Sequence, residues 1–239
     1  MSQHRPASLV FDTPDQLSRW LTGRDDGHLQ QFDEKHRLTA ATAQAFVLMQ
    51  QQARLDGIEL ALVSSYRSFA QQQRIWLAKY QGQRPVYDQQ QQLVAMHSLD
   101  AEAKIRAILL YSALPGASRH HWGTDFDLYD KAAVAADYQV QLLDSEYNSG
   151  GPFYPLHLWL EQHAADFGFF RPYRQDTGGV AQELWHLSYA PEASPLLDAF
   201  ELWMLQDAIR QSELPEQELL LALLPELMQR YVKSICQES

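Results

Sequence analysis

The chain has few segments that can form β-strands, and these are short and irregularly spaced. The clearest is 60–66 (LALVSSY), an apolar run that follows the helix-ending residue Gly57. Further short strands are expected at about 124–129, 169–173 and 183–189. Because the strands do not alternate regularly with helices, the pattern favours an α+β fold with a small, mostly antiparallel sheet flanked by helices.

Helix-capping residues locate most of the expected helices. Thr13-Pro14-Asp15-Gln16 is a capping box with proline at the first helical position, and it predicts a helix that starts there. Further helices are expected at 39–56, at 68–80 and at 98–113, where Ser98 would be the cap. The segment 81–97 contains proline, glycine and a run of glutamines, so we interpret it as an insertion that serves either as a lid or as surface filler.

The C-terminal part is rich in leucine and helical in pattern from Pro195 onward, with divisions expected near Pro215 and Pro225. It carries no residues with recognisable chemistry. We therefore expect a helical extension at 1–33, a central domain at 34–192 and a second helical extension at 193–239.

Charge and cysteine content limit the partners and the compartment. Nineteen Lys and Arg stand against 30 Asp and Glu, and the net charge of −11 argues against nucleic acids and anionic membrane surfaces. The longest apolar run, 219–225, is too short to span a bilayer. Cys236 is the only cysteine, which excludes an intramolecular disulfide. The sequence as written has no secretory signal, so we expect a cytoplasmic protein, or a periplasmic one if the true N-terminus is missing. The oligomeric state stays open.

Two segments combine histidines with carboxylates. They are 118–127 (SRHHWGTDFD) and 183–186 (ELWH). Two imidazoles and one carboxylate, with a coordination position left open, are typical of catalytic zinc sites. A further carboxylate that is not a ligand can act as general base on a water molecule. Together the two segments predict a zinc centre with its own base.

The spacing within the first segment restricts how it can bind a metal. His120 and Asp127 would lie about 23 Å apart on opposite faces of one straight strand. They can share an ion only if the chain bends, and Gly123 permits a bend. Two questions stay open here. Asp125 is either a supporting group or a competing ligand, and only one of His120 and His121 can point inward.

Three ordered motifs resemble those of a known family. The pattern Ser118-x-His120-x-x-Gly123-x-x-x-Asp127, followed by Glu183-x-x-His186, resembles the zinc D-alanyl-D-alanine carboxypeptidases of VanY type. The upstream segment Ser65-Tyr66-Arg67-Ser68 with Gln72 is similar to the same family's first signature. The likeness covers roughly residues 36–190. It implies the zinc D-Ala-D-Ala peptidase (hedgehog-like) fold, with 34–192 as the catalytic domain.

The resemblance also implies a role for each matching residue. One Zn²⁺ per chain would be held by His120, Asp127 and His186. Glu183 would be the catalytic base, and Arg67 would bind substrate and stabilise the developing oxyanion. Gln72 and Ser118 would line the pocket for the terminal D-residue. Ser65, Asp125 and Leu184 depart from the family's usual residues, which affects the expected substrate preference rather than the metal site.

The expected activity is removal of a C-terminal D-alanine from peptidoglycan-type peptides, with stem peptides or muropeptides as partners. Alternatives within the family are an L,D-carboxypeptidase and a D,D-dipeptidase or endopeptidase. A different alternative is a non-hydrolytic, zinc-containing module that binds cell-wall peptides. Glu183 separates the classes, because a structural zinc needs no unligated carboxylate beside it.

Overall fold

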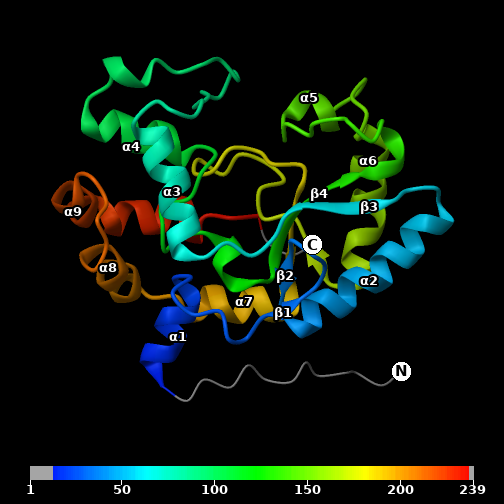
Figure 1. Ribbon diagram of the computed structural model, residues 1–239, viewed down its shortest axis with the longest axis horizontal. Coiled ribbons are helices and arrows are strands. Elements are labelled where there is room, and N and C mark those ends of the chain that lie inside the picture. Colours follow the sequence, from blue (N-terminus) through cyan, green and yellow to red (C-terminus); the bar gives the residue numbers. More distant parts are fainter. Residues whose placement is uncertain (1–12, 237–239) are drawn as a thin grey trace.

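The computed structural model describes residues 13–236. Its helices and strands, in chain order, are α1 (Pro14–Leu21), β1 (Gln30–Gln31), β2 (Arg37–Leu38), α2 (Ala40–Leu55), β3 (Leu60–Ser64), α3 (Phe69–Tyr80), α4 (Ala101–Leu109), β4 (Asp125–Asp130), α5 (Asp144–Tyr147), α6 (Tyr154–His163), β5 (Phe169–Phe170), β6 (His186–Tyr189), α7 (Ala190–Ala199), α8 (Leu202–Arg210) and α9 (Gln217–Leu227). Helices flank a small antiparallel sheet, so the expected α+β class is confirmed (Figure 1).

The main sheet has four strands in the order β3-β4-β6-β5, and all neighbouring pairs are antiparallel. β4 is a central strand, and its residues are almost all buried. A separate two-stranded ribbon joins β1 to β2. Since β3, β4 and β6 come from distant parts of the sequence, the sheet brings together the three segments that carry the sequence motifs.

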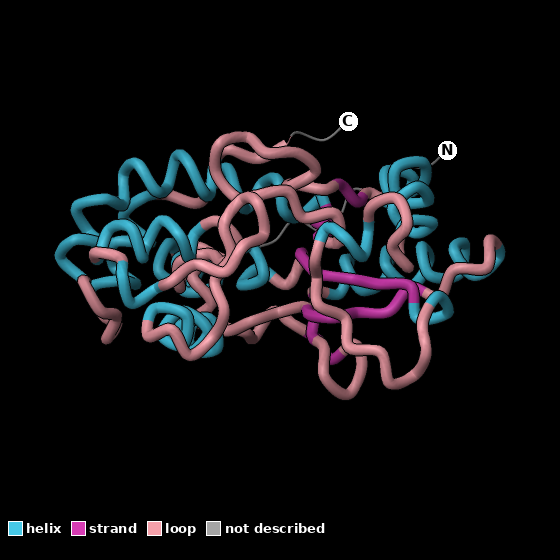
Figure 2. The backbone as a smooth tube through the Cα atoms, turned by 90° about the horizontal axis from the view of Figure 1, so that it is seen from above, coloured by secondary structure: helices cyan, strands magenta, loops and turns pink. Residues whose placement is uncertain are grey.

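Two hydrophobic cores stabilise the molecule. One lies around the sheet, where Phe46 of α2 packs against Phe126 of β4 at a ring-centroid distance of 4.7 Å. The other is formed by helices and includes Trp76 of α3 together with residues of α4, α8 and α9. The strands accordingly lie in one half of the molecule and this helical group in the other (Figures 1 and 2).

Capping explains where most helices begin. Thr13, Thr39 and Ser68 each accept a hydrogen bond from a backbone N–H of the first turn, as their sequence positions predict. The helix expected at 98–113 is shorter and begins later. Asp100, not Ser98, caps α4, because Ser98 belongs to the 3₁₀ turn Met96–Ser98.

The C-terminal helices pack on the rest of the molecule. α8 and α9 share the helical core with α4, so residues after 193 complete this core. The sequence predicts a division near Pro225, but this proline lies inside α9 and does not separate two helices. A π-helical turn at Met228–Lys233 follows α9. Within residues 13–236, no helix combines the length and the apolar character that crossing a bilayer requires.

Candidate active site

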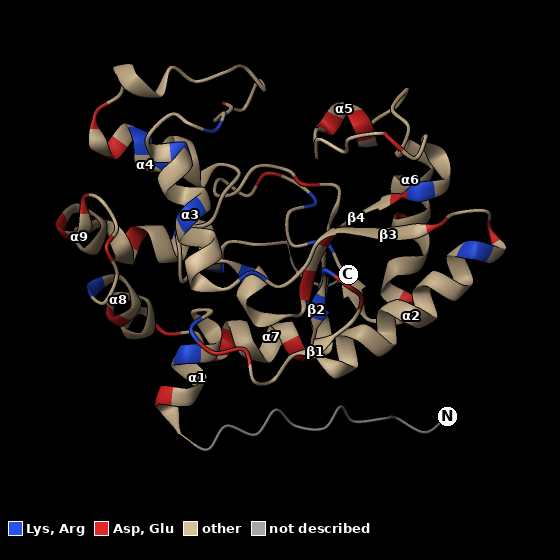
Figure 3. Cartoon of the chain, viewed as in Figure 1, with Lys and Arg blue, Asp and Glu red and all other residues tan. Residues whose placement is uncertain are grey.

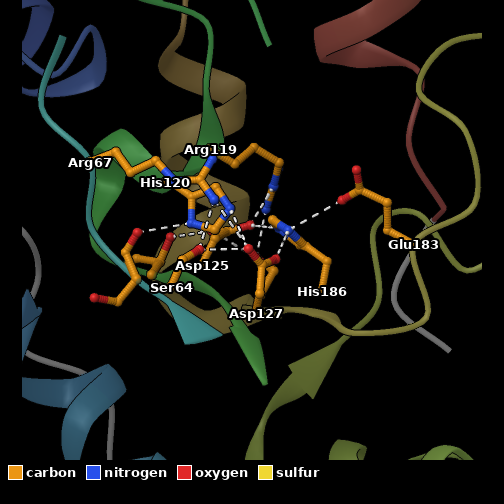
Figure 4. Close-up of polar contacts among 11 residues, drawn as sticks. Ser64, Arg67, Arg119, His120, Asp125, Asp127, Glu183 and His186 are labelled. Atoms are coloured by element: carbon orange, nitrogen blue, oxygen red, sulfur yellow. Dashed lines mark hydrogen bonds and ion pairs between the residues drawn. The ribbon is translucent and has the colours of Figure 1, made fainter. Parts of the chain in front are cut away.

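Strand pairing places Asp127 of β4 between two other polar residues. Asp127 is the register partner of Ser64 on β3 and of His186 on β6. Directly opposed residues on antiparallel strands have neighbouring side chains. The carboxylate accepts a hydrogen bond of 2.6 Å from Ser64 Oγ, and its other oxygen lies 3.1 Å from His186 Nδ1 (Figure 4). The register of the sheet therefore creates half of the predicted metal site.

A 3₁₀ turn at Arg119–Trp122 supplies the other half. Gly123 ends this turn with a φ of 73°, and a Cβ there would lie 2.2 Å from Leu29 Cδ2. Glycine therefore makes the predicted bend between His120 and Asp127. As a result, His120 Nε2 lies 3.5 Å from Asp127 Oδ2.

The two adjacent histidines point to different sides. His120 Nδ1 lies 2.9 Å from the carbonyl oxygen of Ser65, which can only accept, so Nδ1 carries the proton and Nε2 keeps a free lone pair. His121 instead bridges two backbone groups. Its Nδ1 donates to the Arg67 carbonyl at 2.6 Å, and its Nε2 accepts from the Gly116 N–H at 3.0 Å. His120 is therefore the histidine that faces Asp127 and His186.

These three residues form a donor set suited to a metal ion. One ligand atom each from His120, Asp127 and His186 can be chosen so that all lie within 4.8 Å of one another, and all three residues are buried. Burial, helped by the charge of Arg67, lowers the pKa of His120 to about 3, so its imidazole is neutral and free to coordinate. Two histidine nitrogens and one carboxylate oxygen are ligands that Zn²⁺ prefers. The residues present thus fit the ion that the sequence predicts.

Asp125 lies on the far side of His186 from Asp127. Its carboxylate is 3.1 Å from His186 Nε2 and accepts a hydrogen bond of 2.7 Å from Arg119 Nε. Burial opposes ionisation, but Arg119 and His186 hold the pKa of Asp125 well below its usual range. Burial lowers the pKa of His186, but its hydrogen bonds to Asp125 and Asp127 outweigh this effect and raise the pKa to about 9. Asp125 is therefore outside the ligand trio and orients the imidazole of His186, as carboxylates behind metal-binding histidines commonly do.

Glu183 stands beside the trio without joining it. Its Oε2 lies 3.6 Å from His186 Nδ1 (Figure 4). A backbone hydrogen bond of 2.9 Å from Glu183 N to Tyr173 O fixes the segment that carries it. Burial raises the pKa of Glu183 to about 7, against the opposing influence of His186. A carboxyl group with a pKa near neutrality can both accept and return a proton at physiological pH.

Arg67 follows β3 and contacts the trio directly. Its Nη2 lies 3.2 Å from Asp127 Oδ2 and 2.7 Å from Ser64 Oγ. The backbone N–H of Arg67 donates to the carbonyl of His120 at 3.1 Å. No acceptor among residues 13–236 pairs with Arg67 Nε or Nη1, so part of the guanidinium is free to bind a further anion.

A cavity of about 480 Å³ opens next to these groups. Its lining includes residues of α3 and of the segment after it, the segment 141–143 and all three residues of the trio. Ser118 lines the cavity as expected, but Gln72 is not among the lining residues. The Gln72 side chain is buried and donates to the Ala113 carbonyl at 2.8 Å, so its predicted contact with substrate stays a prediction.

Some site residues had no signal in the motifs. Ser64 was not singled out, although a serine at the end of an apolar strand next to the Arg67 motif marks the position. Arg119 was also missed, because a buried arginine next to two histidines cannot be told from a surface one by sequence. Its 2.7 Å contact with Asp125 depends on the bend at Gly123.

Comparisons with known proteins agree with this geometry. The sequence model of the VanY family, described as D-alanyl-D-alanine carboxypeptidase, matches residues 35–192. An uncharacterised protein of Haemophilus influenzae is 31% identical over 121 residues, which make up 50% of this chain and 92% of the relative.

Solved structures show the same fold. A vancomycin-resistance D,D-pentapeptidase VanY in complex with Zn(II) is 24% identical, with a TM-score of 0.50, and the match covers 72% of this chain and 84% of that one. VanYB in complex with D-alanine-D-alanine is 21% identical, with a TM-score of 0.51, and the match covers 80% of this chain and 92% of that one. With a family match over most of its length and the ordered motifs gathered at one cavity, the chain belongs to the VanY family of peptidases.

Proposed function

We propose that this protein is a zinc-dependent carboxypeptidase that removes the C-terminal D-alanine from peptidoglycan-type peptides. The observation that carries the proposal is Glu183, a buried carboxyl group 3.6 Å from His186 Nδ1 but outside the ligand trio. A structural metal site has no use for such a group. The Zn(II) complex of a VanY protein of similar fold supports the choice of ion.

The ion would be held by His120, Asp127 and His186. When bound, zinc polarises the scissile carbonyl and lowers the pKa of water toward about 7. Asp125 keeps the imidazole of His186 in place through its 3.1 Å hydrogen bond. Ser64 and Arg67 hold one carboxylate oxygen of Asp127, so the trio is fixed before substrate arrives.

The remaining steps belong to Glu183 and Arg67. Glu183 takes a proton from the attacking water and delivers it to the amine of the leaving D-alanine. Arg67 lines the cavity, and its unpaired guanidinium nitrogens stabilise the negative charge that develops on the carbonyl oxygen. Peptide hydrolysis needs both tasks, and each falls to a residue that lines the cavity.

The test uses defined muropeptides with tri-, tetra- and pentapeptide stems, with mass spectrometry of the products. The zinc-loaded protein is expected to shorten the pentapeptide by one alanine. Release of the dipeptide, cleavage of the tetrapeptide or cleavage within the stem would instead indicate a D,D-dipeptidase, an L,D-carboxypeptidase or an endopeptidase.

Glu183→Gln tests the role of Glu183 as the catalytic base. The variant keeps its zinc, because Glu183 is not a ligand, and loses a factor of roughly 10² to 10⁴ in kcat. Glu34→Gln, an exposed residue outside the cavity, is the matched control and leaves kcat unchanged. If Glu183→Gln turns over at the wild-type rate, Glu183 is not the catalytic base. If the wild type cleaves none of the peptides, the non-hydrolytic binding module becomes the better description.

A further inference from the structure

Lys79 and Ser112 meet at one point of the cavity wall. Lys79 lies in the last turn of α3, and Ser112 lies just beyond α4. Lys79 Nζ donates a hydrogen bond of 2.6 Å to Ser112 Oγ, and both residues line the cavity that contains the metal trio. Because Ser112 Oγ accepts from the ammonium group, its own O–H is left to donate. An ammonium donor and a hydroxyl donor thus lie next to each other in the cavity wall.

The charge of Lys79 has no partner within the described part of the chain. No carboxylate there forms an ion pair with it, and Ser112 is a neutral contact. Burial lowers the pKa of Lys79 to about 8, although the negative charge of Glu183 opposes this shift, so the ammonium is still charged at pH 7. A half-buried cation without a counter-ion costs free energy, which an arriving anion would recover.

The surroundings favour a carboxylate carried by a peptide. Arg84, in the segment after α3, lines the same cavity and adds a second positive charge on this side. Figure 3 shows basic positions on α3, whereas the acidic positions of α5 lie apart from this helix in the view. The apolar side chains of Ile75 and Val180, also in the lining, suit the aliphatic parts of a peptide.

We propose that Lys79 and Ser112 form a binding site for a carboxylate of the peptide substrate, separate from the metal trio and from Arg67. This inference rests on the proposed carboxypeptidase function and deepens it. The ammonium and the hydroxyl bind the two carboxylate oxygens together, which makes Lys79 a specificity-determining residue. A stem peptide offers two candidate carboxylates, one at its C-terminus and one on a diaminopimelate side chain.

Two other roles for Lys79 make different predictions. If Lys79 only linked α3 to the end of α4, its replacement would lower stability and affect all substrates alike. If it acted only through the charge of Glu183, its replacement would change the turnover of every peptide by the same factor. A binding site instead predicts an effect that depends on which carboxylates the peptide carries.

The experiment compares three pentapeptides with zinc-loaded wild type, Lys79→Met and Ser112→Ala. The first peptide has a free C-terminus and diaminopimelate at position three, the second has a terminal carboxamide, and the third has lysine in place of diaminopimelate. Lys131→Met, which removes an exposed lysine outside the cavity, is the control for charge. Both kcat/KM and peptide affinity are measured, the latter by calorimetry in a Glu183→Gln background, in which turnover is strongly reduced.

Lys79→Met is expected to lower kcat/KM and affinity for the first peptide by about 10- to 100-fold, mainly through KM. Ser112→Ala is expected to give a smaller loss in the same direction, and Lys131→Met none. The loss of kcat/KM and affinity caused by Lys79→Met disappears with the carboxamide peptide if Lys79 binds the C-terminus. It disappears with the lysine peptide if Lys79 binds the side-chain carboxylate. An equal penalty on all three peptides, or no penalty, overturns the inference.

Peptide affinity and turnover are measured separately, so the binding site and the carboxypeptidase function can be refuted independently. Peptides that bind in a Lys79-dependent way without being cleaved would refute the carboxypeptidase function and leave the binding site standing. Cleavage unaffected by Lys79→Met would refute the site alone. If none of the peptides binds or is cleaved, both proposals are wrong.

Discussion

The neighbouring residues His120 and His121 divide two tasks between them. His120 offers Nε2 to the metal trio, whereas His121 uses both ring nitrogens on the backbone at Arg67 and Gly116. Since the Arg67 N–H also donates to the His120 carbonyl, the turn and the strand end are joined by several short contacts. The position of Arg67 relative to the trio is therefore set by the backbone as much as by its own side chain.

Metal content distinguishes these two histidines. His120→Ala is expected to lose most of the one zinc ion per chain, because two ligands remain, whereas His121→Ala keeps the ion and loses stability instead. Asp127→Ala and His186→Ala behave like His120→Ala. Metal analysis of the purified variants after dialysis provides the measurement. Zinc retained by His120→Ala but lost from His121→Ala would show that the ligand assignment is wrong.

Arg67 gives a second prediction at this scale. Arg67→Ala is expected to cost on the order of 2–4 kcal/mol in transition-state stabilisation, seen chiefly in kcat. Arg67→Lys recovers only part of this, since Nη2 of the arginine contacts Asp127 and Ser64 and its other guanidinium nitrogens stay available for the substrate, whereas lysine has a single nitrogen. Steady-state kinetics with the free pentapeptide, accompanied by metal analysis, measures both effects. A normal kcat in Arg67→Ala would exclude a role in oxyanion stabilisation.

At the scale of elements, β4 carries both carboxylates that form hydrogen bonds with His186. Asp125 and Asp127 lie two residues apart on the same face of this strand, so His186 of β6 fits between them. Alternation predicts the shared face from the sequence alone. It does not predict which carboxylate is the ligand, because that depends on where the turn at Arg119–Trp122 places His120.

Sequence reasoning works best for features set by local chemistry. The helix starts at Thr13, Thr39 and Ser68 and the bend at Gly123 were all predicted, since each depends on a few adjacent residues. The late start of α4 was not, because Ser98 and Asp100 are both good caps and Ser98 belongs to the 3₁₀ turn that precedes the helix. The contact of Lys79 with Ser112 was beyond reach because it joins residues 33 positions apart.

The packing of α8 yields a prediction about the C-terminal helices. Leu205 is 1% exposed and belongs to the helical core, so Leu205→Ala is expected to lower the free energy of unfolding by about 2–5 kcal/mol. Leu55→Ala is the matched control, because Leu55 is 80% exposed and its loss is nearly neutral. Urea unfolding monitored by circular dichroism measures both. We propose that the extension 193–239 unfolds together with the rest, and a separate transition for it would contradict this.

For the whole molecule, buried neutral histidines link stability to pH. Burial lowers the pKa of His121 to about 4, against about 6.5 in an unfolded chain. Between these values the unfolded chain takes up a proton that the folded protein does not, so the contribution is complete above pH 6.5 and is lost as the pH falls toward 4. His28 behaves in the same way, because burial lowers its pKa to about 4 as well.

The free energy of unfolding is therefore expected to fall by about 2 kcal/mol for each such histidine between pH 7.5 and pH 5. His121→Asn reduces stability at pH 7.5 but flattens this pH dependence, whereas His97→Asn, at an exposed position, changes neither. Denaturant titrations at the two pH values provide the measurement. An unchanged slope in His121→Asn would show that this imidazole is already protonated in the folded state.

The two hydrophobic cores described above meet at the metal trio. Trp122, in the same turn as His120, belongs to the helical core, while Phe126 and Leu187, next to Asp127 and His186, belong to the sheet core. An ion held by the trio would thus tie the two halves of the molecule across their boundary. A chelator should leave each core intact and weaken the connection between them. Gentle heating of the apoprotein would then let the two halves move relative to one another, at temperatures where both still resist hydrogen exchange.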